Sequence, residues 1–300
     1  MKKALALVLA LSLGLCLCAC SAPAEQARVM ASFYPMYIFA LNVFEGVEGV
    51  AVECMTAPDT GCLHDYQLLV SDMMKLSEAS LFIVCGAGME NYLDDVAKQF
   101  PELEIVDCSQ GIDLLPAEED EHHHDHEDEE DYNAHTWLDA QNAILIVHTI
   151  SDAAVRRFPK QEAKIRANEA AYVARLEALD ETLKTQLAPL AGKKIVTFHE
   201  AFPYFARAYG LEVAAVISEE HEDSLSPSQL IEVIDAVQAA GVPPLFTEPQ
   251  YSATAAYAVA AETGAAIYQL DPLASGEYAP DAYEKGMLAN AQVLLAAFGQ

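Results

Sequence analysis

The longest uninterrupted helical pattern in this chain covers residues 161–187 and reads QEAKIRANEAAYVARLEALDETLKTQL. It contains no Gly or Pro and is rich in Ala, Glu, Lys and Leu, which are all good helix formers. At 1.5 Å per residue, a helix of this length would be roughly 40 Å long, enough to run the length of a small two-lobed protein. The stretch therefore predicts a rigid helix between two halves of the chain.

Short apolar runs alternate with amphipathic stretches on both sides of this helix. Before it, strands are expected at 29–33, 50–55, 81–85 and 104–108, and helices at 36–44, 66–76, 89–100 and 139–158. After it, strands are expected at 194–198, 213–217, 245–247 and 266–270, and helices at 201–209, 227–240, 253–263 and 281–298. The runs are apolar on both faces, which is typical of parallel strands covered by helices. The predicted fold class is α/β, with two parallel-sheet α/β lobes joined by a long rigid backbone helix.

These patterns divide the chain into four parts. We expect a signal peptide over 1–19, an N-terminal α/β lobe over 28–158, a linker helix over 159–189 and a C-terminal α/β lobe over 190–300. About 280 residues after the signal exceed the usual ~100–150 of a single domain, which agrees with two lobes.

The first twenty residues are typical of an export signal. Lys2 and Lys3 precede an apolar run over 4–17, which is shorter than the ~20 residues that a membrane-spanning helix needs. The run ends in Leu17-Cys18-Ala19-Cys20, which resembles a bacterial lipobox and predicts lipid on Cys20. The alternative is an ordinary cleaved signal with a chance cysteine.

The charge balance limits the partners of the chain. A formal net charge of −30 argues against nucleic acid, because phosphate attracts the opposite sign. It also argues against electrostatic adhesion to anionic lipid, so the lipid on Cys20 would hold the protein to the membrane.

Four further cysteines remain after processing: Cys54, Cys62, Cys85 and Cys108. Outside the cytoplasm they can pair in three ways, and each could equally be a small buried apolar residue. They are dispersed and form no Cys-x-x-Cys, which argues against a zinc cluster built from thiolates.

Three histidines and one aspartate occur at strand ends or in loops. His64 follows the second expected strand, His135 precedes a helix, His199 ends the first strand of the second lobe and Asp271 ends its last strand. Ligands of open parallel sheets bind beyond the carboxyl ends of the strands, so we expect these four side chains to face one cleft, two from each lobe. Three imidazoles and a carboxylate are a plausible tetrahedral set for Zn²⁺. Taken singly, a loop histidine is more often a surface residue, and Asp before Pro is usually turn chemistry.

The segments around these residues resemble the zinc and manganese solute-binding proteins of ABC importers. The resemblance runs from about residue 28 to the end of the chain, in the order of the family. It is carried by His64-Asp65-Tyr66 with Ser71-Asp72, by His135-Thr136-Trp137-Leu138, by His199-Glu200-Ala201-Phe202-Pro203-Tyr204-Phe205, by Phe246-Thr247-Glu248-Pro249-Gln250 and by Leu270-Asp271-Pro272-Leu273. Two departures are Cys62-Leu63, where the family often has Ser-Pro, and Asn133-Ala134, where it has Asp-Pro.

The resemblance implies a metal receptor and assigns its residues. It makes His64, His135, His199 and Asp271 the metal ligands, and Glu248 a residue that supports a ligand or the contact between lobes. In the family the third ligand is His for zinc and Glu for manganese, so His199 favours Zn²⁺, with Mn²⁺ as the alternative. The implied function is extracytoplasmic capture of zinc and its delivery to the permease and ATPase of an ABC importer, by a monomer without enzymatic activity.

An acidic, histidine-rich segment covers residues 118–131. It holds ten carboxylates and four histidines, and no apolar residue, so it cannot bury surface and is expected to be disordered. It resembles the His-rich loop of zinc-type members. His122, His123, His124 and His126 would then form an accessory, low-affinity metal collector; the alternative is a solvated acidic loop.

Two other functions are considered beside metal transport. A zinc hydrolase also holds its metal with three ligands, but it keeps an open position for water and would need Glu200 or Glu248 as a general base. The chain contains no His-Glu-x-x-His and no Gly-x-Ser-x-Gly. A surface adhesin is the second rival, because that role has been suggested for some relatives.

Overall fold

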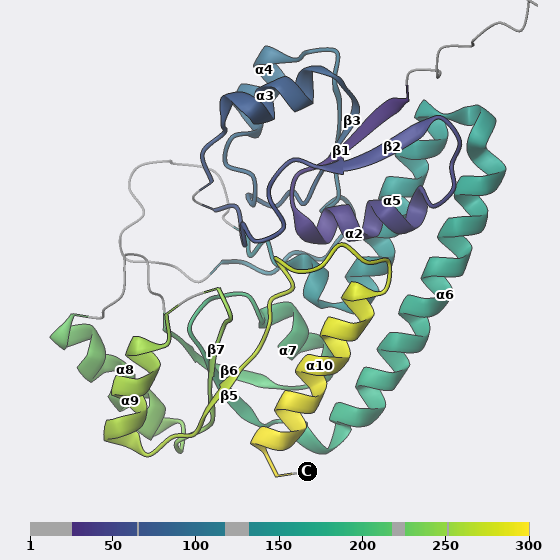
Figure 1. Ribbon diagram of the computed structural model, residues 1–300. Coiled ribbons are helices and arrows are strands. Elements are labelled where there is room, and N and C mark those ends of the chain that lie inside the picture. The colour runs from purple at the N-terminus through teal and green to yellow at the C-terminus, as the bar shows by residue number, and fades with distance from the viewer. Residues whose placement is uncertain (1–25, 65, 118–131, 218–225, 251, 300) are drawn as a thin grey trace, which may run out of the picture.

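Two four-stranded parallel sheets organise the computed structural model, which describes residues 26–64, 66–117, 132–217, 226–250 and 252–299 (Figure 1). The first sheet has the order β2-β1-β3-β4 and contains β1 (Ala27–Ala31), β2 (Val50–Cys54), β3 (Ala79–Val84) and β4 (Glu104–Asp107). The second has the order β6-β5-β7-β8 and contains β5 (Lys194–Thr197), β6 (Glu212–Val216), β7 (Leu245–Thr247) and β8 (Ile267–Gln269). The predicted fold class is confirmed.

Helices connect successive strands and cover the sheets. The N-terminal lobe has α2 (Tyr34–Val43), α3 (Val70–Ser77), α4 (Leu93–Gln99) and α5 (Ala140–Arg157), and the C-terminal lobe has α7 (Pro203–Tyr209), α8 (Pro227–Ala239), α9 (Thr254–Thr263) and α10 (Ala282–Ala297). Local chemistry sets several of the boundaries. Asp139 caps α5 by accepting a 2.8 Å hydrogen bond from Gln141 N. Pro203 occupies the first turn of α7, and Gly210, with a φ of 77°, ends it in the left-handed conformation.

Two predicted helices begin four residues later than the sequence suggested. The helix expected over 89–100 is α4, which starts at Leu93. The helix expected over 66–76 starts at Val70, because the carboxylate of Asp72 binds the residues before it. Asp72 Oδ2 accepts hydrogen bonds from Leu69 N at 3.0 Å and from the Tyr66 hydroxyl at 2.7 Å. Residues 66–69 are thereby held as a loop that leads from the His64 region into the helix.

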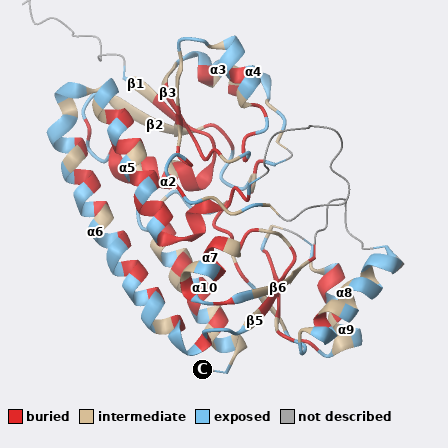
Figure 2. Ribbon diagram, turned by 180° about the vertical axis from the view of Figure 1, so that it is seen from behind, coloured by how far each residue is buried: buried red, intermediate tan, exposed pale blue. Residues whose placement is uncertain are grey.

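The long helix α6 (Glu162–Leu187) lies along both lobes, as Figure 1 shows. One face of the helix is buried and the opposite face is exposed (Figure 2). The buried apolar residues are spaced three, four or seven apart, and they are Ile165, Tyr172, Leu176, Leu179, Leu183 and Leu187. Polar groups add to this packing. Asn168 donates to the backbone oxygens of Val43 and Glu45 at 2.9 and 2.8 Å, which joins α6 to the end of α2. The helix therefore braces both lobes.

The main hydrophobic cluster runs through both lobes, and a second, smaller cluster lies within the C-terminal lobe. The indole of Trp137 is fully buried, packs edge-on against Phe33 at 5.4 Å, and donates through Nε1 to the oxygen of Pro272 in the C-terminal lobe at 2.7 Å. The Tyr204 hydroxyl donates to Asn133 O across the same junction at 2.9 Å. Because close packing resists sliding, these contacts favour small local shifts over a wide opening of the lobes.

Each sheet has one point at which the strand order reverses, between β1 and β3 in the first and between β5 and β7 in the second. In doubly wound sheets ligands bind at such points, beyond the carboxyl ends of the strands. His199 follows β5 and Glu248 follows β7, so the fold brings these two side chains together at the switch point of the C-terminal lobe.

Two predicted features lie outside the described residues: the signal and lipobox over 1–20, and the acidic run over 118–131. The described residues on either side of the acidic run lie side by side, because Pro116 forms a β-bridge with Tyr132 and Asn133 N donates to Leu115 O at 2.9 Å. Among the described helices, none combines the length and apolarity needed to cross a bilayer.

Candidate metal centre

The three histidines singled out from the sequence lie together at the junction of the lobes. The ring centroids of His64 and His135 are 5.1 Å apart, those of His135 and His199 are 4.6 Å apart, and those of His64 and His199 are 6.0 Å apart. His64 Nε2 lies 3.5 Å from His135 Nε2. His135 is deeply buried at 2% exposure, whereas His64 is exposed, so the cluster runs from the surface inward.

Asn133 orients the ring of His135. Its Nδ2 donates to Glu200 O at 2.7 Å, which directs its Oδ1 toward His135. That oxygen accepts from His135 N at 3.0 Å and lies 3.3 Å from His135 Nδ1. In the reverse orientation, the amide NH₂ would face the His135 N–H and the amide oxygen would face Glu200 O, which are two repulsive pairs. Oδ1 therefore faces His135, and Nδ1 of that ring carries the proton. The lone pair of Nε2 is then free to face the other histidines.

Glu248 orients His199 in the same way. Both of its carboxylate oxygens lie 3.2 Å from His199 Nδ1, and Glu248 is only 2% exposed. A buried carboxylate on Nδ1 favours the tautomer that leaves Nε2 available as a donor to a cation. The same contact turns Glu248 away from the Nε2 side of the ring, where a metal-bound water would have to lie.

Asp271 lies on the loop after β8 and is partly buried. Its Oδ1 accepts from Leu273 N at 2.8 Å, and its backbone N donates to Asn290 Oδ1 at 2.9 Å, which together fix the Asp-Pro turn. Burial raises the pKa of the nearby Cys62 thiol well above its ordinary value, and the charges of Glu248 and then Asp271 add to the shift. Burial raises the pKa of Asp271 itself, with hydrogen bonds from Leu273 and Gln250 opposing the shift.

The site is built to accept positive charge. Burial, followed by the neighbouring His199 and His64, lowers the pKa of His135 well below its ordinary value of 6.5, so this ring is neutral near pH 7. Neutral imidazoles offer lone pairs, and the carboxylate of Glu248 supplies negative charge beside His199. A divalent cation would bind these lone pairs and would offset the negative charge of the buried carboxylate.

Sequence reasoning missed one member of the cluster. Cys62 Sγ lies 3.5 Å from His135 Nε2, and the donor atoms of Cys62, His135 and His199 all lie within 4.8 Å of one another. The only signal in the sequence was its position two residues before His64. The spacing of the cysteines in the sequence could not predict that one thiol lies beside imidazoles from distant segments.

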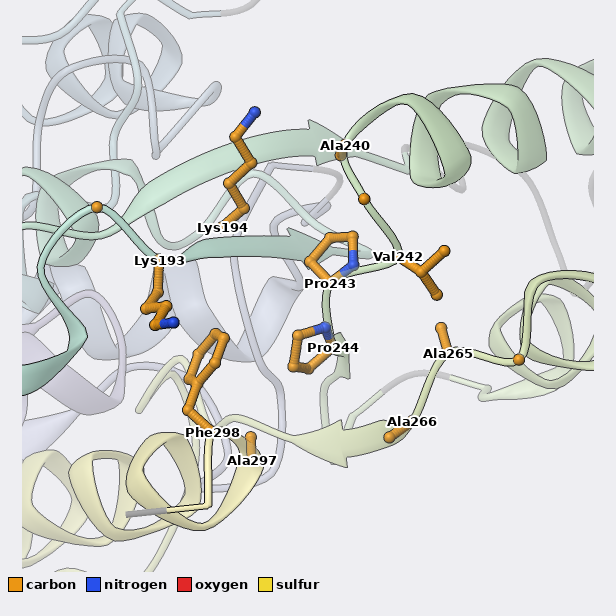
Figure 3. A pocket seen from close by; sticks show the side chains of 13 residues that line it. Lys193, Lys194, Ala240, Val242, Pro243, Pro244, Ala265, Ala266, Ala297 and Phe298 are labelled. Carbon is orange, nitrogen blue, oxygen red and sulfur yellow. The ribbon is translucent and has the colours of Figure 1, made fainter.

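A pocket of about 640 Å³ lies elsewhere on the described chain (Figure 3). It is formed by Gly192 and the start of β5, the turn before β7, the turn before β8 and the end of α10, at the opposite end of the second sheet from His199. Its ionisable residues are Lys193 and Lys194, which would repel a cation. The pocket therefore has no part in the histidine cluster.

The fold and this cluster define a class: two-lobed α/β proteins with nitrogen, sulfur and carboxylate donors at the junction of the lobes. A family model described as zinc-uptake complex component A, periplasmic (ZnuA), matches residues 29–297. The chain belongs to this family.

Similar proteins include both zinc- and manganese-binding members by name. The chain is 30% identical over 187 residues to the manganese-binding lipoprotein MntA of Halalkalibacterium halodurans, covering 62% of this chain and 59% of that protein. It is 29% identical over 270 residues to the high-affinity zinc uptake system protein ZnuA of Yersinia pestis, covering 83% and 84%. A crystal structure of ZnuA superposes with a TM-score of 0.76 at 27% identity, covering 91% of this chain and 99% of that one. The match spans only about half the length of the streptococcal zinc-binding AdcA proteins.

Proposed function

We propose that this protein is an extracytoplasmic receptor that captures Zn²⁺ and delivers it to an ABC importer, and that it is not an enzyme. The observation that carries the proposal is the convergence of His64, His135 and His199 from three distant segments onto one point between the lobes. Asp271 completes the proposed set of ligands. Imidazole-rich sites suit zinc better than manganese, which prefers carboxylate and water.

Two buried groups support the proposed ligands. Asn133 and Glu248 hold the Nδ1 atoms of His135 and His199, so each ring is pre-oriented with Nε2 toward the cation. Glu248 binds the Nδ1 side of the His199 ring, away from the proposed ion, so it is badly placed to act as the general base of a hydrolase. This arrangement favours binding over catalysis.

Release of the ion would follow from movement of the loops that carry the ligands. The main hydrophobic cluster and the Trp137–Pro272 hydrogen bond favour a fixed arrangement of the lobes, whereas the His64 loop lies at the surface. We infer that docking on the permease and its ATPase displaces such a loop and breaks the coordination set. Lipid on Cys20 would hold the receptor near the importer.

The segment 118–131 would act as an accessory collector. His122, His123, His124 and His126 stand among carboxylates on one short stretch and would bind zinc weakly before the central site takes it up. The stretch ends four residues before His135 in the sequence, so the chain itself would keep a collected ion near a proposed ligand.

Metal analysis of protein purified without chelator tests the proposal. The wild-type protein should retain one zinc per chain after dialysis against a weak chelator, and His199→Ala should lose it. The matched control is His148→Ala, because His148 binds Glu169 between α5 and α6, away from the cluster, and its loss should leave the zinc content unchanged. Equal zinc in wild type and His199→Ala would refute the assignment.

Manganese is the second candidate cargo, because the MntA relative is named for it. Competition between the two ions for the purified protein separates the candidates. Zinc should displace manganese at far lower concentration, whereas equal or stronger binding of manganese would reassign the cargo.

An adhesin role would be an added function on the same fold. The laminin-binding protein Lmb of Streptococcus agalactiae, whose structure is similar at 25% identity, is described as bifunctional, with adhesin and metal-transporting activity. Binding of the purified chain to immobilised laminin, with and without zinc, tests whether this chain shares that second activity.

A further inference from the structure

Cys62 is held firmly at the edge of the histidine cluster. It is a free thiol on the loop between β2 and α3, two residues before His64. Leu63 is fully buried and its N–H lies 3.4 Å from Met89 Sδ, while Asn91 Nδ2 donates to the backbone oxygen of His64 at 2.7 Å. These contacts fix the backbone on the C-terminal side of Cys62, so the position of its sulfur follows from the fold of the loop.

The distances within the cluster are those of a coordination sphere. Two ligands on one tetrahedral zinc ion would be separated by about 3.5 Å when one is sulfur and the other nitrogen, and by about 3.3 Å when both are nitrogen. Cys62 Sγ lies 3.5 Å from His135 Nε2, and His64 Nε2 lies 3.5 Å from the same atom. The sulfur and the second imidazole thus face the free lone pair of His135 at the spacing that a shared cation would set.

The mutual arrangement includes the C-terminal lobe. Among the described His, Cys, Asp and Glu side chains, the group whose donor atoms all approach within 4.8 Å consists of Cys62, His135 and His199. His64 and Asp271 are outside that group; His64 approaches His135 at 3.5 Å, and Asp271 has Oδ1 turned toward Leu273 N. The sulfur is therefore better placed than the carboxylate to share an ion with these two imidazoles.

We propose that Cys62 is a metal ligand of this protein, binding the ion through its thiolate together with His135 and His199. The inference rests on the proposed function, since it assigns Cys62 to the same ion as the residues proposed above. When the ion binds, the S–H bond breaks and the proton goes to solvent. The resulting thiolate then coordinates the cation through a sulfur lone pair. A thiolate favours zinc, cobalt and other ions that accept sulfur, and it disfavours manganese, so Cys62 would sharpen the selection of zinc.

Cobalt(II) serves as a spectroscopic probe of the zinc site in the full chain. Wild-type protein loaded with one cobalt should show visible d–d bands of a low-symmetry site, together with an intense near-ultraviolet charge-transfer band from thiolate to cobalt. Cys62→Ser should keep the d–d bands and lose the charge-transfer band. The matched control, Cys54→Ser, removes a half-buried thiol at the end of β2 that contacts Thr56, and this variant should retain both bands.

Each result has one meaning. Cobalt bound by wild type without a charge-transfer band, or a band that persists in Cys62→Ser, would overturn the role of Cys62 and leave the receptor function standing. Failure of wild type to bind cobalt or zinc would overturn both. X-ray absorption of the zinc-loaded wild-type protein gives an answer that needs no variant, because a zinc–sulfur distance of about 2.3 Å is expected. A shell of nitrogen and oxygen alone would exclude the thiolate.

Discussion

Replacing Glu248 by Gln tests whether the buried carboxylate prepares His199 for the ion. Both oxygens of Glu248 lie 3.2 Å from His199 Nδ1, and the side chain is shielded from water. Gln keeps the shape but removes the charge, and it can present an NH₂ group to Nδ1, which would favour the tautomer with the proton on Nε2. Loss of such a supporting contact typically lowers metal affinity by about 10- to 100-fold.

The expected loss converts to about 1.4–2.8 kcal/mol of binding free energy. At saturating zinc the same amount disappears from the stabilisation that the ion gives the folded state. For a protein of this size, the zinc-induced rise in Tm should then be smaller by roughly 3 to 10 °C in Glu248→Gln than in wild type.

Two assays measure the effect: competition against a chromophoric zinc chelator, and thermal unfolding with and without zinc. The control variant is Glu262→Gln, which removes an exposed carboxylate from α9 and should leave both values unchanged. Wild-type zinc affinity in Glu248→Gln, or an equal loss in the control, would refute the idea that Glu248 acts through His199.

Three further perturbations test other parts of the structure. Trp137→Phe should lower the free energy of unfolding by about 2 kcal/mol, because it leaves a cavity and an unpaired Pro272 carbonyl, and urea unfolding at constant m-value measures this. Burial raises the pKa of Glu90 from 4.5 to about 7, so between these pH values the folded protein holds a proton that the unfolded chain releases. The contribution of Glu90 to the free energy of unfolding therefore falls by about 3 kcal/mol as the pH rises through this range. The stability of Glu90→Gln relative to wild type should therefore increase across that range, and parallel profiles would contradict the shift. Deleting residues 118–131 and joining Ala117 to Tyr132, which forms a β-bridge with Pro116, should preserve one tight zinc site and remove only weaker binding in titration calorimetry. Loss of the tight site would show that the deleted segment, and not the histidine cluster, holds it.

Much of the architecture could be read from the sequence because its signals are local. Parallel strands buried on both faces appear as short apolar runs, and the stretch over 161–187 has neither Gly nor Pro to end a helix. Boundaries were less accurate. The helix expected from 66 begins at Val70, because the Asp72 side chain competes for the backbone and hydroxyl donors that precede it.

The identity of the candidate site was partly readable and its geometry was not. His64, His135 and His199 stood out by their places at strand ends, and the resemblance joined them to Asp271. Cys62 did not stand out, since its importance depends on a 3.5 Å approach to a residue 73 positions later in the chain.

The sequence by itself determined the α/β alternation, the long bracing helix and the residue types available to a cation, because each depends on neighbours within a few positions. Only the tertiary structure decided which of those residues meet. Strand order places His199 and Glu248 just beyond the ends of two adjacent strands, and the packing of Trp137 against Phe33 and Pro272 sets the distance between the lobes. The physical reason is that coordination depends on distances of a few ångströms between segments far apart in the chain, which only the packed core can set.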